Sequence, residues 1–115
     1  MIRKLIYLAA PYTSNPEENV KKALDAADIV FARGYIPYVP HLSHHWHTQS
    51  PKSYEQWMEM GSAVLERCDA VLRLPGESPG ADEEVKQAQS IGKPVYYGLE
   101  ELPIIPVMEG CGNMG

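Results

Sequence analysis

The sequence has few cysteines, no long apolar run and no excess of basic residues. Its 115 residues include two cysteines, Cys68 and Cys111, too few and too poorly spaced for a disulfide scaffold or a zinc ribbon. The longest apolar runs are about half of what a membrane span requires, so we expect no membrane partner. The chain enters a strand-like run almost at once, and we expect no signal peptide.

The charge balance is acidic. The formal net charge of −5 argues against a surface for polymeric nucleic acid, which needs a basic footprint, but permits a small anion at a local site. With both cysteines read as reduced thiols, we expect a cytoplasmic protein. We expect one domain over residues 1–103 and a C-terminal arm over residues 104–115.

Strand-like and helix-like segments alternate along the chain. Strands are predicted over residues 4–10, 35–40, 69–75 and 93–98, and helices over residues 13–34, 53–68 and 81–92. Residues 41–52 are predicted to be a loop, and residues 102–107 a short extra strand or an extended arm. In the first helix, the residues at helical spacing that we expect on the sheet are Val20, Leu24, Ala27 and Phe31.

This alternation predicts an α/β fold, a doubly wound, Rossmann- or flavodoxin-like domain of three layers with a parallel sheet of four to five strands. Ligands of such sheets bind outside the carboxyl ends of the strands. The candidate substrate-binding residues at the end of the first strand are Ala10, Pro11 and Tyr12.

One acid differs from its neighbours in the third helix. On a period of 3.6, Ala81, Val85, Ala88 and Ile91 form the buried stripe, and Asp82 and Glu83 fall on the solvent side. Glu84 lies on the border of the buried stripe and would point back towards the preceding turn. It is either a functional carboxylate or an acid that caps the margin of the helix.

The turn before this helix is a candidate binding element. Ser78 and Gly80 introduce a helix N-terminus whose free N–H groups suit a phosphate or sugar hydroxyls. The alternative is an ordinary strand–turn–helix connection with Ser78 as the cap.

Three blocks resemble one family. They are IYLAAPYT, PYVPHLSHHWH and CDAVLRLPGESPGADEEVKQAQSIGKPVYY, and together they cover most of residues 5–97. The sequence resembles the nucleoside 2-deoxyribosyltransferase-like superfamily, which includes the deoxynucleoside 5′-monophosphate N-glycosidases, and looks closest to a small uncharacterised branch of it.

The resemblance implies roles for particular residues. It implies that Glu84 is the nucleophile, that Tyr7 and Asp69 are catalytic partners, and that Ser78 holds phosphate in nucleotide-specific members. Tyr7 is alternatively a core aromatic and Asp69 a turn cap. The chain departs from the family pattern at Gly61, where an Asp is usual, with Glu59 a potential substitute.

The expected function is therefore cleavage of an N-glycosidic bond in a small nucleoside or nucleotide, as a 2-deoxyribosyltransferase or an N-glycoside hydrolase. Glu84 would form a covalent glycosyl-enzyme intermediate, and no cofactor is implied. The alternative is a non-catalytic nucleotide-binding or sensing module, which Gly61 favours.

The histidine-rich segment HLSHHWH permits three interpretations. The first is a ligand-binding loop in which His41, His44 and Trp46 contact base or phosphate. The second is a zinc site, but no familiar ligand spacing such as HExxH completes it, so we predict no native metal. The third is a plain packed or solvated loop.

The resemblance also implies a homo-oligomer, a dimer or tetramer. Its members complete their sites with the C-terminal segment of a neighbouring subunit, and Asn113 in the arm is the candidate contact here.

Overall fold

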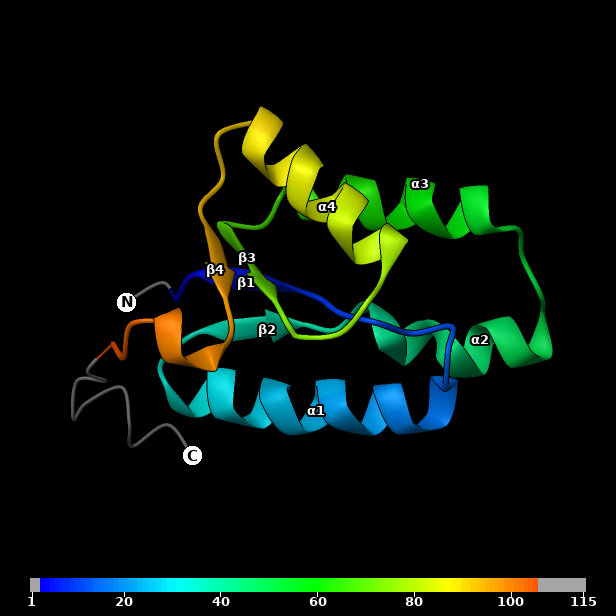
Figure 1. The fold of residues 1–115 in the computed structure, drawn as a ribbon, viewed down its shortest axis with the longest axis horizontal. Helices are drawn as coiled ribbons and strands as arrows, with labels where there is room; N and C mark the ends of the chain where they lie inside the picture. The colour runs from blue at the N-terminus through cyan, green and yellow to red at the C-terminus, as the bar shows by residue number, and fades with distance from the viewer. Residues whose placement is uncertain (1–2, 106–115) are drawn as a thin grey trace.

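The computed structural model describes residues 3–105 as a four-stranded sheet between two helical layers (Figure 1). The strands are β1 (Leu5–Ala9), β2 (Ile36–Tyr38), β3 (Ala70–Arg73) and β4 (Val95–Tyr97). The helices are α1 (Pro16–Ala32), α2 (His44–Gln49), α3 (Tyr54–Leu65) and α4 (Pro79–Ser90), with 3₁₀ turns η1 (Pro40–Ser43) and η2 (Leu99–Glu101).

The sheet has the order β2-β1-β3-β4, and every pair is parallel. α1 lies along one face, and α3 and α4 lie along the other (Figure 1). This confirms the predicted α/β architecture of three layers. Residues 102–105 form no strand, so the described chain has four strands rather than five.

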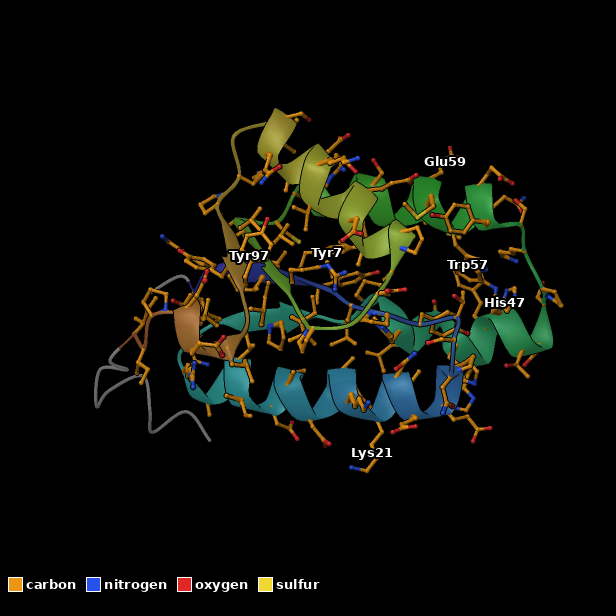
Figure 2. The ribbon with its side chains drawn as sticks, viewed as in Figure 1. Tyr7, Lys21, His47, Trp57, Glu59 and Tyr97 are labelled. Carbon is orange, nitrogen blue, oxygen red and sulfur yellow. The ribbon has the colours of Figure 1, made fainter. Side chains whose placement is uncertain are left out.

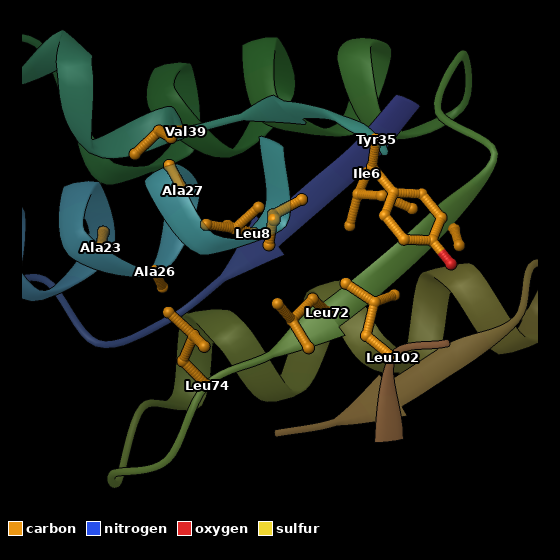
Figure 3. Close-up of a cluster of buried hydrophobic side chains, with 12 residues drawn as sticks. Ile6, Leu8, Ala23, Ala26, Ala27, Tyr35, Val39, Leu72, Leu74 and Leu102 are labelled. Carbon is orange, nitrogen blue, oxygen red and sulfur yellow. The ribbon is translucent and has the colours of Figure 1, made fainter. Parts of the chain in front are cut away.

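The face of β1 that meets α1 is apolar (Figure 3). Ile6 and Leu8 from β1 and Leu72 from β3 pack there against alanines of α1. Successive strand residues point to opposite faces, so Tyr7, Ala9 and Val71 belong to a second cluster with Leu65 of α3 and Ala81 and Ala88 of α4.

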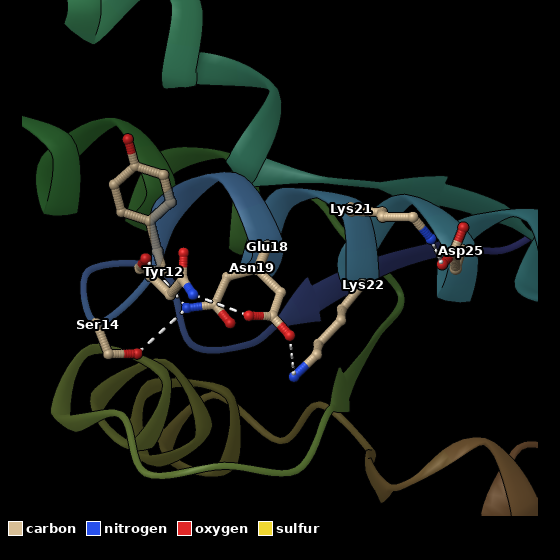
Figure 4. Close-up of polar contacts among 8 residues, drawn as sticks. Tyr12, Ser14, Glu18, Asn19, Lys21, Lys22 and Asp25 are labelled. Atoms are coloured by element: carbon tan, nitrogen blue, oxygen red, sulfur yellow. Dashed lines mark hydrogen bonds and ion pairs between the residues drawn. The ribbon is translucent and has the colours of Figure 1, made fainter.

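The predicted sheet-facing stripe of α1 is confirmed at Ala27 and wrong at Leu24 and Phe31. Its buried residues are Ala23, Ala26, Ala27 and Val30, while Leu24 and Phe31 are 37% and 54% exposed. Small alanines let the helix lie close to the sheet, and the larger apolar residues fall on its flanks. At the start of α1, the Asn19 side chain donates to Tyr12 O and Ser14 Oγ (Figure 4).

The end of α1 holds the last described segment of the chain. The Arg33 guanidinium donates to the carbonyls of Leu99 and Leu102, and Tyr35 Oη donates to Pro103 O at 2.6 Å. The Ile105 N–H donates to Arg33 O at 2.9 Å, beside Gly34, whose φ of 104° requires glycine. Leu102 is thereby buried in the α1-side cluster.

The predicted loop over residues 41–52 is mostly helical, as η1 and α2. Pro40 occupies the first turn of η1, a favourable place for proline, but the segment carries no apolar period that would reveal a helix. No described helix is long and apolar enough to cross a membrane, in the span of residues 3–105.

Candidate active site

Glu84 lies in the second turn of α4 and faces the interior between α3 and α4. Ala81, Val85 and Ala88 are buried as the helical period predicts, while Ile91, beyond the end of α4, is exposed. Asp82 and Glu83 are exposed, and Glu84 is partly buried. The three consecutive acids therefore have different surroundings.

Tyr7 holds this carboxylate from the middle of β1. Its hydroxyl donates a hydrogen bond to Glu84 Oε2, and its ring is completely buried, 5.6 Å from the ring of Tyr38 on β2. Burial and the adjacent carboxylate both raise the pKa of the Tyr7 hydroxyl, so this tyrosine is neutral and donates.

Burial also raises the pKa of Glu84, to about 7. The hydrogen bond from Tyr7 and the charge of Arg73 oppose this rise, and the charge of Glu83 adds to it. Glu84 is thus a carboxyl group that changes its charge near neutral pH, a property found at many catalytic acids and nucleophiles.

Gly61 of α3 lies directly above the pair. A Cβ at this position would be 2.8 Å from Tyr7 Oη and 3.5 Å from Glu84 Oε2. Gly61 is the position at which the family resemblance implies an acid, and it lies beside Tyr7 and Glu84. The Tyr7 hydroxyl fills the space that a side chain at this position would need. Glu59, the potential substitute, is exposed and lies on the outer side of α3, so that suggestion is wrong (Figure 2).

Asp69 does not lie beside Tyr7 and Glu84. It precedes β3 at the amino end of the sheet, and its Oδ2 accepts the Leu5 N–H at 2.7 Å. This contact is that of a strand-end cap, the alternative stated for this residue, so we give Asp69 no part in the chemistry.

The segment after β1 is joined to the histidine-rich segment after β2. His41 is buried, and because a carbonyl can only accept, its Nε2–H donates to Pro11 O at 2.7 Å. Burial lowers the pKa of His41. Tyr12 Oη is hydrogen-bonded to His44 Nδ1 at 2.7 Å, so Ala10, Pro11 and Tyr12 form a fixed wall at the carboxyl edge.

Trp46 lies at the rim, 51% exposed, with its ring edge-on to Trp57 of α3 at 5.2 Å. The Lys52 ammonium lies over its face at 4.7 Å. Trp57 Nε1 donates to His47 Nδ1 at 2.8 Å and so joins α2 to α3 (Figure 2). These contacts engage several polar atoms of the histidine-rich segment. Within residues 3–105, no group of three or more His, Cys, Asp or Glu side chains is arranged to hold a metal ion.

Ser78 caps α4, since its Oγ accepts the Ala81 N–H at 3.1 Å. Gly80, in the same turn, lies under Tyr54 of α3, whose Oη would be 3.3 Å from a Cβ at that position. A capping box between Ser53 and Gln56 starts α3 and fixes where Tyr54 lies.

A cleft of about 560 Å³ opens at the carboxyl ends of β3 and β4. It is lined by Arg73, Leu74, Asp82 and Tyr97 among others, but Glu84 is not among its lining residues. The cleft lies on the β4 side of α4, whereas Tyr7 of β1 and Gly61 of α3 meet Glu84 on the other side. We place the candidate site at the carboxylate because burial and hydrogen bonding converge there.

Sequence reasoning missed two contributors, Tyr38 and Arg73. Arg73 has a 10% exposed side chain at the end of a buried strand, where arginine is unusual, and that position was the available signal. Tyr38 gave no such signal, because aromatic residues are common in strands.

A family model described as Domain of unknown function (DUF7768) matches residues 4–98. The chain belongs to this family. No curated protein matches it.

Solved structures share the DUF7768 fold. A 2-deoxyribosyltransferase from Leishmania mexicana superposes with a TM-score of 0.62 at 18% identity, over 82% of this chain and 63% of that one. A 2-deoxyribosyltransferase from Bacillus psychrosaccharolyticus, described as a biocatalyst for nucleoside synthesis, gives 0.61 at 21% identity, over 81% and 70%. The chain spans less than two thirds of the Leishmania protein, and the likeness establishes the fold.

Cys68 is buried as a free thiol, and burial raises its pKa to about 11, which makes it a poor nucleophile. Cys111, Asn113 and most of the expected arm lie outside the described residues.

Proposed function

We propose that the protein cleaves or transfers an N-glycosidic bond of a small nucleoside or nucleotide, with Glu84 as the nucleophile. The observation that carries this proposal is the partly buried Glu84 carboxylate held by the Tyr7 hydroxyl. It occurs on a fold shared with 2-deoxyribosyltransferases, at the helix that follows β3.

The proposed chemistry uses a carboxylate twice. A Glu84 oxygen bonds to C1′ as the bond from C1′ to the base nitrogen breaks, and the departing base keeps the electron pair and takes up a proton. Water, or the nitrogen of a second base, then attacks C1′, and the ester bond to Glu84 breaks. Two inversions at C1′ give net retention.

Tyr7 has a positioning role in this scheme. Its hydroxyl donor stabilises the ionised carboxylate, which is the attacking form, and fixes the oxygen that does not attack. Because the pKa of Glu84 is about 7, kcat/KM is expected to rise with pH through this value.

The second candidate is a nucleotide-binding or sensing module without turnover. It is favoured by Gly61, which places no acid beside Tyr7 and Glu84 to assist the departing base. This candidate predicts ligand binding without release of free base.

A panel of 2′-deoxynucleosides and their 5′-monophosphates tests both candidates, with free base measured by chromatography. Release is expected from at least one member, and Glu84→Gln is expected to reduce it by at least about a thousandfold, since the nucleophile is lost. Glu66→Gln is the control, because it removes an exposed carboxylate beyond the last turn of α3. Equal release by the Glu84 variant would assign the reaction to another group.

We further propose a cytoplasmic homo-oligomer, a dimer or tetramer, whose arm over residues 104–115 contributes to a neighbouring site. The buried free thiol of Cys68 is consistent with a reducing compartment. Light scattering of the full chain, and of the chain ending at residue 105, would measure the oligomeric state and its dependence on the arm.

A further inference from the structure

The start of α4 has few N–H groups left for an anion. Helix N-termini attract phosphate through unpaired backbone N–H groups. At the first four positions of α4, Pro79 has no N–H, the Ala81 N–H is bonded to Ser78 Oγ and the Asp82 N–H to Ser78 O. Within this described turn, only the Gly80 N–H is not used in this way.

Side chains of α3 cover this remaining position. A Cβ at Gly80 would meet Tyr54 Oη at 3.3 Å and Met58 Sδ at 4.0 Å. Burial, together with the nearby charges of Glu83 and Glu84, raises the pKa of the Tyr54 hydroxyl. The space in front of Gly80 thus contains a neutral phenol near two carboxylates.

The segments that follow β1 and β3 carry only negative formal charge. Residues 10–18 and 74–84 contain no Lys or Arg, and their acids are Glu17, Glu18, Glu77, Asp82, Glu83 and Glu84. Arg73, at the end of β3, already donates to the carbonyls of Leu74 and Gly76 and pairs with Asp82 at 3.0 Å. Its charge is therefore compensated within the protein.

The side chains after β2 are engaged as well. His41 donates to Pro11 O, His44 is bonded to the Tyr12 hydroxyl, and the Lys52 ammonium lies over Trp46. None of these contacts directs a cation at the first turn of α4.

Resting on the proposed function, we infer that this site accepts an uncharged deoxynucleoside and discriminates against the corresponding 5′-monophosphate. A phosphate monoester carries a charge of about −1.5 to −2 at pH 7. Near α4 it would meet the carboxylates of Glu77 and Glu83, and no Lys or Arg in these segments balances their charge, because Arg73 pairs with Asp82. The Ser78 hydroxyl, which the family resemblance assigns to phosphate, serves here as the helix cap.

The test compares kcat/KM for release of the same base from a 2′-deoxynucleoside and from its 5′-monophosphate, at low and physiological ionic strength. The nucleoside is expected to be preferred by at least about tenfold at 10 mM salt. The preference is expected to narrow at 150 mM, because the Debye length falls from about 30 Å to about 8 Å. Equal or better turnover of the monophosphate would overturn the inference and leave the proposed function standing.

Charge variants locate the source of the discrimination. The double variant Glu77→Gln/Glu83→Gln removes two negative charges. At low salt it is expected to reduce the ratio of kcat/KM for the nucleoside to that for the monophosphate by about three- to tenfold. Glu66→Gln, the same change of charge at the end of α3 beyond its last turn, is the control and is expected to leave the preference unchanged. If the preference for the nucleoside changes neither with salt concentration nor in the double variant, charge repulsion is not its cause.

Binding supplies a readout that does not need turnover. Calorimetry with Glu84→Gln is expected to show heat of binding for the nucleoside and at least about tenfold weaker binding of the monophosphate. If neither ligand releases base in the native chain, the proposed activity fails and calorimetry alone decides the preference. Tighter binding of the monophosphate, or no binding of either, would overturn the inference.

Discussion

The two faces of the sheet differ in what β1 contributes to them. On the α1 side, Ile6 and Leu8 enter an apolar cluster (Figure 3). On the other side, Tyr7 reaches a carboxylate on α4 that is partly removed from water. Residues adjacent in one strand thus contribute either to stability alone or to a site whose charge costs stability.

The difference shows how a small domain can hold a partly buried carboxyl group. Removing a carboxylate from water is unfavourable, and Glu84 retains part of this penalty as a raised pKa despite the Tyr7 hydrogen bond. The apolar face has no such group among its buried residues within the described chain, so it offsets the cost. Each variant below tests one side of this comparison by its free energy of unfolding.

The largest effect is expected from Leu8→Ala on the apolar face. Leu8 is fully buried, and its truncation removes apolar contact and leaves a cavity, so the free energy of unfolding should fall by about 3 kcal/mol. Urea denaturation at several pH values measures this loss, which should not depend on pH. Leu24→Ala, on the flank of α1, is the control and should cost under about 1 kcal/mol; equal losses would reject the assigned face.

Glu84→Gln should stabilise the protein, but only at higher pH. The folded pKa of about 7 exceeds the ordinary value of 4.5, so the carboxyl favours folding below pH 4.5 and this contribution is lost as the pH rises through 7. The variant should gain at most about 3 kcal/mol over the native chain at pH 8.5 and almost nothing at pH 4.5. Thermal denaturation across this range measures the gain, with Glu66→Gln, which removes an exposed carboxylate beyond the last turn of α3, as the control. A gain independent of pH would contradict the buried charge.

Gly61→Ala should lower the free energy of unfolding by about 1 kcal/mol. Alanine favours the helix by about 1 kcal/mol, but its Cβ would lie 2.8 Å from Tyr7 Oη and displace a fully buried side chain. Chemical denaturation gives the net value. Gly80→Ala is the matched control, because its Cβ meets the half-exposed Tyr54, which can move aside. A clear stabilisation by Gly61→Ala would show that α3 does not rest on the Tyr7 hydroxyl.

Tyr7→Phe should have the smallest effect on stability, about 1 kcal/mol or less at pH 5, where Glu84 is neutral, because one hydrogen bond between uncharged groups is lost and the ring remains. Its diagnostic effect is on the site. Without the donor, the pKa of Glu84 should rise further, and base release should require a higher pH. Carboxyl carbon NMR titration measures the shift, and Tyr38→Phe, which keeps the Tyr7 donor, should leave it nearly unchanged.

Much of the architecture followed from residue patterns, because short continuous apolar runs and helix-capping residues are specified by local sequence. The inward orientation of Glu84 followed from its place between Ala81 and Ala88. The face of α1 did not, since alanines and larger apolar residues made two neighbouring stripes equally plausible, and only packing against the sheet selects the alanines.

The contacts across the site were beyond the reach of the sequence. Nothing local reveals that Gly61 lies against Tyr7, because that contact depends on how closely α3 approaches β1. Asp69 matched a family pattern, yet its carboxylate serves the Leu5 N–H. The helical form of the segment after β2 depends on contacts such as that of His47 with Trp57, which come from another helix.

The hydrogen bonds from Arg33 and Tyr35 to the segment after β4 determine where a truncated form of this protein can end. Family likeness ends at residue 98, yet Leu102 is among the most buried side chains, and Arg33 and Tyr35 each hold carbonyls beyond that point. A fragment ending at residue 98 would lack Leu102, which would leave a cavity in the α1-side cluster. It would also lack the carbonyls to which Arg33 and Tyr35 donate at the end of α1. The folded domain is therefore longer than the region that the family model matches.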